Sequence, residues 1–206
     1  MKTKLWQYVG SEVVRNYDYV WFMDDDMLFS KDVFPYDQFL QVVRKADAVI
    51  SSPKIIRDTG KTKKHKGTVI GETLSSKFFE KVDMIEEDSV MFKQEAWIFF
   101  HDNILMDTPN SDYGADCVWC PIFTIEHFGK VPCLRALHYG LIHTNGRTLA
   151  IPNVHYGKDG AHNRAKDLYG KKIKSMYNDT IKMICDPNRL TVETFPISQQ
   201  YHNMHN

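Results

Sequence analysis

The sequence lacks several features that would assign it to a common class of protein. No apolar run approaches the roughly 20 residues that a membrane-spanning helix needs, and the first residues show no secretory-signal pattern. Its 26 basic and 26 acidic residues balance, so no excess charge indicates nucleic acid or an anionic membrane as a partner. The absence of G-x-S-x-G, P-loop and glycine-rich dinucleotide motifs weakens hydrolase, kinase and dehydrogenase interpretations.

Cysteine is also sparse, with four residues in the chain: Cys117, Cys120, Cys133 and Cys185. Cys117 and Cys120 form a C-x-x-C pair, which would suit zinc or redox chemistry if a second close pair were present. No second pair exists, so the spacing favours ordinary buried thiols. A disulfide and a zinc module remain the two alternatives.

The most informative segment that is present runs from Tyr17 to Asp26. Residues 20–23 are apolar and predict a strand that is buried on both faces, with Trp21 in the core. Three consecutive acids, Asp24–Asp26, follow at once, and such charges cannot be buried without partners. A strand that ends in stacked negative charge, where ligands of α/β proteins bind, indicates a divalent cation site, with a solvated acidic turn as the alternative.

The remaining pattern alternates between helices and strands and predicts an α/β fold with a mixed, mostly parallel sheet flanked by helices. The expected helices cover 1–16, a segment capped by Asp37, 93–105, a segment after residue 111 that ends at Gly129, and 161–185; the expected strands cover 18–23, 48–51 (ended by Pro53) and 134–142. We expect residues 1–150 to form the core, and 151–206 to add a basic helix and a polar tail. The basic segment 57–68 is expected to be a solvated loop, with a cover for a phosphate-bearing substrate as the alternative.

Three groups of chemically useful residues stand at the ends of expected elements: Asp24–Asp26, Asp116 behind Gly114, and His143. Oxygen ligands with one imidazole suit Mn²⁺, and Mg²⁺ next. An ion that is half coordinated by protein would leave positions for a diphosphate. His138 and His155 are rival ligands to His143.

Four segments together resemble the GT-A glycosyltransferases, and most closely the DUF707 family of glycosyltransferase-like proteins. They are 17–27, which ends in a D-x-D-type motif; 85–97, which shares an acid, Phe, Ala and Trp with the family; 113–116; and 142–146. Order and spacing agree over roughly residues 5–150. The resemblance implies a GT-A-like fold and transfer of a sugar from a nucleotide-diphosphate sugar to an acceptor hydroxyl of a carbohydrate or glycoconjugate.

The resemblance also implies roles for individual residues. Asp24, Asp25 and Asp26 would bind the ion and the ribose–diphosphate, with Asp26 as the most direct metal ligand and Asp24 beside it. His143 would be the second, C-terminal metal ligand. Asp116 would be the acceptor-side acid, a general base if the enzyme inverts, and Glu86 would face the sugar or the acceptor.

Other interpretations of the same acids are a metal-dependent phosphohydrolase and a non-catalytic or carbohydrate-binding remnant of the fold. The family has a longer portion before its D-x-D strand, whereas 23 residues precede Asp24 here. We therefore expect either an N-terminally truncated chain, or a site completed by a reduced fold or by a partner, such as a second copy in a homo-oligomer. As part of a longer eukaryotic protein it would belong to the Golgi or secretory pathway, and otherwise to the cytoplasm.

Overall fold

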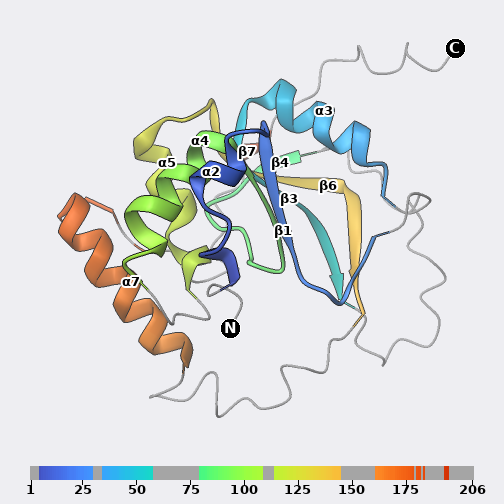
Figure 1. Cartoon of the computed structure of the whole chain (residues 1–206). Helices are drawn as coiled ribbons and strands as arrows, with labels where there is room; N and C mark the ends of the chain where they lie inside the picture. The colour runs from blue at the N-terminus through green and yellow to red at the C-terminus, as the bar shows by residue number, and fades with distance from the viewer. Residues whose placement is uncertain are drawn as a thin grey trace, which may run out of the picture.

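In the part of the chain that the structure describes, a seven-stranded open sheet lies between helices, which makes this a mixed α/β protein (Figure 1). The strands are β1 Tyr19–Met23, β2 Met27–Leu28, β3 Ala48–Arg57, β4 Phe79–Lys81, β5 Ser89–Lys93, β6 Val131–His143 and β7 Glu193–Thr194. The computed structural model describes residues 5–29, 34–57, 79–108, 114–144, 161–178, 180–181, 183 and 193–194. Arg57 belongs to β3, and the rest of the predicted basic loop or cover, residues 58–68, lies with most of the predicted tail outside the described residues.

The sheet is mixed in direction, and the expectation that it is mostly parallel is wrong. Its order is β1-β5-β3-β6-β4-β7, with β2 paired to the end of β6. Among the described residues only β3 and β6 pair in parallel, whereas β1–β5, β3–β5, β2–β6, β4–β6 and β4–β7 are antiparallel. The sequence pattern missed this because β5, a short buried strand from a distant part of the chain, inserts between β1 and β3.

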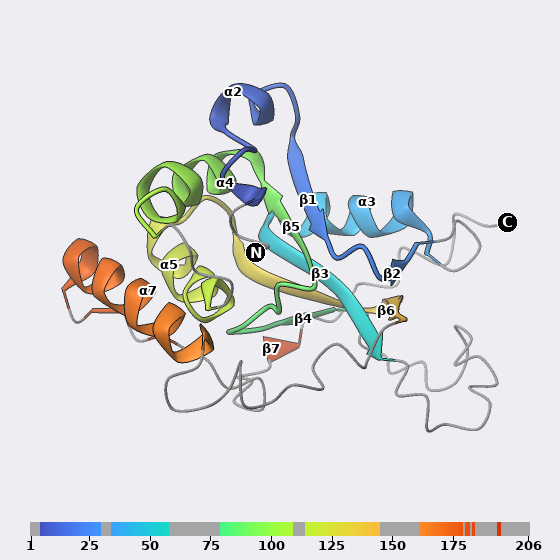
Figure 2. The same cartoon turned by 60° about the horizontal axis from the view of Figure 1, so that its bottom comes forward.

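Helices cover both faces of the sheet (Figure 2). The helix α3, Tyr36–Ala46, lies on one face, and α4, Gln94–Phe100, lies on the other with α5, Trp119–Glu126, and α7, Ala161–Tyr177. Two separate apolar clusters occupy these two faces. Trp97 and Trp119 are completely buried in the larger cluster, as the sequence predicts for core residues.

Strands β1 and β5 show why the sheet forms as it does. Val20 and Phe22 point to the face covered by α4, where they pair with Phe92 and Val90, and Trp21 points to the opposite face. Successive strand residues alternate between faces, so a strand that is apolar at every position needs cover on both sides. The helices on the two faces supply that cover.

The predicted strand at 48–51 does not end at Pro53, because β3 continues to Arg57. Proline cannot donate to a strand ladder and is tolerated at bulges. The register with β6 shifts at this point: Pro53 lies opposite Ala136, but Lys54 lies opposite Gly140. The bulge absorbs the proline and lets both strands run on to the edge of the sheet where the acids lie.

Three helix predictions need correction. The segment 1–16 is not one helix, since the helical residues Leu5 and Trp6 are separated from the short α2, Ser11–Val14, by residues 7–10. The helix α3 starts after Pro35 rather than at an Asp37 cap. The last helix, α7, ends at Tyr177, where Asn178 takes a positive φ of 55°, earlier than the predicted 185.

The predicted helices at 93–105 and after residue 111 each divide into two elements. The first becomes α4 followed by a π-helical turn, η1, at His101–Leu105. The second becomes a 3₁₀ turn, η2, at Ala115–Cys117, followed by α5, which ends at Glu126. The predicted strand at 134–142 is confirmed within the longer β6.

A disulfide joins Cys120 of α5 to Cys133 of β6, with the two Cα atoms 5.6 Å apart. Cys117 is disulfide-bonded as well. The expectation of ordinary buried thiols is therefore wrong for these residues. The cause is tertiary: α5 packs on β6 and brings together two sulfurs that are 13 residues apart in the sequence.

Candidate metal site

The acidic turn Asp24–Asp26 lies between β1 and β2. The Asp24 N–H donates a hydrogen bond to the Asp88 carbonyl, 2.9 Å away, which ties the turn to the start of β5. The Met27 N–H donates to the Asp24 carbonyl at 3.2 Å and closes the turn. The chain then enters β2, so the three acids occupy a short backbone segment held at both ends.

His143 is the last residue of β6 and lies directly across from Met27 of β2. The next residue, Thr144, donates two hydrogen bonds to the Asp26 carbonyl, one from its N–H at 2.9 Å and one from its hydroxyl at 2.8 Å. These bonds join Asp26 to the residue that follows His143, across 118 positions of sequence. The protein alone therefore positions both side chains.

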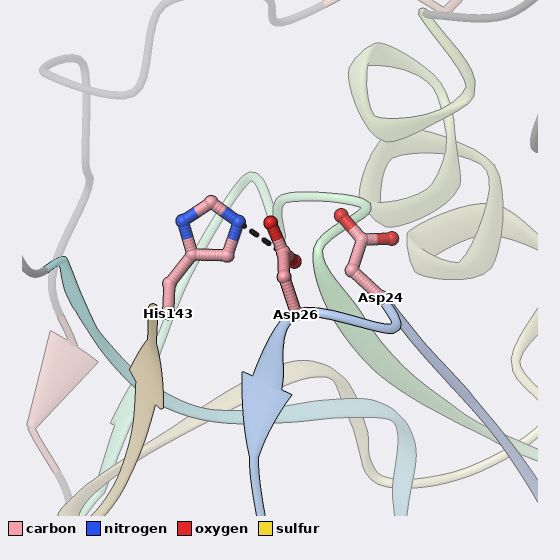
Figure 3. A group of neighbouring side chains, drawn as sticks. All are labelled: Asp24, Asp26 and His143. Carbon is pink, nitrogen blue, oxygen red and sulfur yellow. Dashed lines mark ion pairs between the residues drawn. The ribbon is translucent and has the colours of Figure 1, made fainter. Parts of the chain in front are cut away.

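Asp24, Asp26 and His143 point into one space at the edge of the sheet (Figure 3). One potential ligand atom from each residue lies within 4.8 Å of the other two. The His143 Nε2 is 3.1 Å from the Asp26 Oδ1, and both side chains are largely buried. The structure thus brings together the three residues that the sequence analysis assigned to the metal.

The contact between Asp26 and His143 is close without being a hydrogen bond. Within the described part of the chain, neither the Asp26 Oδ1 nor the His143 Nδ1 has a hydrogen-bond partner. Two ligand atoms at right angles, each about 2.2 Å from one ion, would be about 3.1 Å apart. The separation therefore fits two atoms directed at a shared cation, and the three side chains form a group that could hold a metal ion.

Asp25 differs from its two neighbours. Its side chain is exposed, and it is not part of the three-residue group. The structure therefore separates the three acids of the motif into two that face His143 and one that faces water.

Asp116 is half-buried in η2 and follows Gly114, whose φ of 100° favours glycine. The Ala115 N–H donates to the Glu87 Oε1 at 3.0 Å, and Glu87 is 5% exposed. Since Asp88 holds the acidic turn and Glu87 holds η2, one loop fixes both segments. Asp116 itself lies outside the three-residue metal group.

Glu86 lies outside that group as well. It is half-buried and lines a cleft of about 250 Å³ with Ser52, Lys54 and Arg135. Arg135 also contacts Glu80, with 3.3 Å between Nη1 and Oε1. The cleft is therefore charged, and Glu86 belongs to it. The rival ligands are not placed, since the His138 side chain and His155 fall beyond the described residues.

Sequence reasoning missed two residues near the site. Glu87 is one of them, because no local pattern indicated that its side chain would accept a hydrogen bond from η2. Trp21 was predicted to be core, yet it is half-buried and lines a hollow beside α3. Strand alternation could have found it, because Trp21 and Met23 share a face on which Phe34 and Tyr36 also lie.

No helix in the described ranges combines the length and the apolar character that a bilayer crossing requires. Comparison with protein families, with curated proteins and with solved structures finds no match to this chain.

Proposed function

We propose that this chain is a metal-dependent glycosyltransferase with a GT-A-like fold that uses a nucleotide-diphosphate sugar. The observation that carries the proposal is the convergence of Asp24, Asp26 and His143 at one edge of the sheet. Mn²⁺ or Mg²⁺ held there would neutralise charge on the departing diphosphate. The order of the site's parts along the chain, an acidic turn after a buried strand and a histidine at the end of a later strand, supports the GT-A comparison.

The chain's own residues would divide the work. Asp24, Asp26 and His143 would hold the ion, and the bonds from Thr144 to Asp26 would keep two of these ligands in place. Asp116 would remove the proton from the acceptor hydroxyl as the hydroxyl oxygen bonds to the anomeric carbon of the donor sugar. The bond from that carbon to the diphosphate oxygen breaks, and the nucleotide diphosphate leaves with the electron pair.

Binding of Mn²⁺, followed by UDP or GDP, can be measured by calorimetry on the purified protein. We expect Asp26→Asn to weaken Mn²⁺ binding at least about tenfold, since loss of even an outer-shell partner costs that much. Asp25→Asn is the matched control, because it makes the same charge change at an exposed position in the same turn. An equal loss of Mn²⁺ affinity in both variants would show that only the overall charge of the turn matters. Unchanged Mn²⁺ affinity in Asp26→Asn would refute the role of Asp26 as a metal ligand.

A metal-dependent phosphohydrolase would use the same ion site, and product analysis separates the two activities. The transferase needs an acceptor to consume a nucleotide sugar, whereas the hydrolase releases phosphate or sugar phosphate without one. We expect Asp116→Asn to retain Mn²⁺–UDP binding and to lose transfer. Release of phosphate at an unchanged rate without acceptor would favour the hydrolase.

A further inference from the structure

An aromatic hollow of about 700 Å³ lies on the α3 side of the sheet. We define the aromatic hollow by the residues that line it and that the argument uses: Trp21, Met23, Phe29, Phe34, Tyr36 and Asp37. Phe34 is 1% exposed and forms part of the floor, whereas Met23, Phe29 and Tyr36 are each at least 40% exposed. Large apolar side chains gathered around a concavity in this way are typical of a binding site.

Trp21 is held in a fixed orientation at the centre of the aromatic hollow. Its indole N–H donates to the Ser89 hydroxyl at 2.9 Å. The Tyr36 ring stacks against it at an interplanar angle of 16°, and the Phe29 ring meets it edge-on at 84°. A rigid set of aromatic faces loses little conformational entropy when a ligand binds.

The aromatic hollow adjoins the metal site through the backbone. Met23 directly precedes Asp24, and Phe29 follows β2 directly after the acidic turn. The turn that presents Asp24 and Asp26 is therefore preceded directly by one residue that lines the hollow, Met23, and followed after β2 by another, Phe29. A ligand in the hollow would lie beside whatever the metal site binds.

We infer that the aromatic hollow binds a sugar ring of the acceptor, an inference that rests on the proposed transferase function. The apolar C–H face of a pyranose can stack on the Trp21 and Tyr36 rings, and its hydroxyls can bond to the polar groups of Asp37 and Gln38, which also line the hollow. The Asp37 carboxylate would repel a diphosphate. The charge pattern therefore places a neutral saccharide in the hollow and the anionic donor at the metal.

Tryptophan fluorescence can test this directly, because the other three tryptophans, Trp6, Trp97 and Trp119, are at most 5% exposed. We expect chitotriose, cellotriose or mannotriose to change the emission of the native protein, with or without Mn²⁺, and not that of Trp21→Phe. Tyr36→Ala should weaken binding by about tenfold, the effect of losing one aromatic stack. Tyr17→Ala is the matched control, because Tyr17 is 62% exposed and does not line the hollow.

The same variants separate this inference from the proposed function. Tyr36→Ala should retain Mn²⁺-dependent UDP binding, because that site uses other residues. Saccharide binding without any metal-dependent nucleotide binding would support the aromatic hollow as a saccharide site and refute the proposed transferase function. Any one of three outcomes would overturn the inference. They are displacement of the saccharide by uridine, no fluorescence response to any of the three saccharides, and a loss of saccharide affinity in Tyr17→Ala equal to that in Tyr36→Ala.

Discussion

Reduction of the disulfide between Cys120 and Cys133 should lower stability by a predictable amount. The bond links α5, in the larger apolar cluster, to the strand that ends at His143. Both sulfurs are buried, with at most 2% of either residue exposed. Opening the bond leaves the folded contacts in place and mainly gives freedom back to the unfolded chain.

The magnitude follows from the length of the loop that the bond closes. The two cysteines are 13 residues apart. The chain-entropy relation gives about 10 cal/mol/K for a loop of this length, or about 3 kcal/mol at 25 °C. A loss of about 3 kcal/mol is a large part of the roughly 5–15 kcal/mol that stabilises a typical domain.

The assay is urea unfolding of the native protein and of the double variant Cys120→Ala/Cys133→Ala, each with and without a reductant. The double variant controls for the disulfide at Cys117 and for general effects of the reductant. We expect reduction to lower the free energy of unfolding about 3 kcal/mol more in the native protein than in the variant. Equal effects in the two proteins would refute the pairing. A confirmed pairing would favour an oxidising compartment, in keeping with the secretory alternative.

Two further predictions concern the backbone at Asp116 and the packing of α7. Gly114→Ala should lower the free energy of unfolding in urea by about 1–2 kcal/mol, because φ is 100° there. Gly170→Ala is the control and should not destabilise the protein, because φ at this position in α7 is not positive and the near neighbour is the flexible Met183 side chain. Equal losses of stability in the two variants would contradict this explanation. Burial, and then the hydrogen bond from its hydroxyl to Glu126, raises the pKa of Tyr177. The folded protein therefore keeps this proton at a pH where the unfolded chain, with an ordinary pKa of about 10, loses it, so stability should fall as pH rises above about 10. Tyr177→Phe should show a smaller fall between pH 9 and 11 in the same assay, and an identical fall would exclude Tyr177 as the cause.

Local pattern was enough to predict the elements around the metal site. The apolar run 20–23 could only be stable as a covered strand, and the acids after it had to leave the sheet. The strand before His143 was predicted from a mostly apolar run and is confirmed in β6. Both residue types and their order along the chain thus indicated which side chains could share a cation.

Pairing between distant segments was beyond local pattern. The insertion of β5 between β1 and β3 made both of these strand pairs antiparallel, where a mostly parallel sheet was expected. The register shift at Pro53 let β3 continue past a residue that normally ends a strand. The Cys120–Cys133 disulfide depends on how α5 packs on β6. Each of these features depends on contacts between residues that are far apart in the sequence, and the local hydrophobic pattern does not indicate such contacts.

The sequence by itself determined the types of candidate ligand, because a carboxylate or an imidazole at the end of an apolar strand has few ways to be satisfied. Only the tertiary structure decided which of those ligands meet. It turned Asp24 and Asp26 toward His143 and left Asp25 in water, and it placed Glu86 in a separate charged cleft. The physical reason is that the turn and the strand are fixed by hydrogen bonds from Asp24 to Asp88 and from Thr144 to Asp26, which join parts of the chain far apart in sequence.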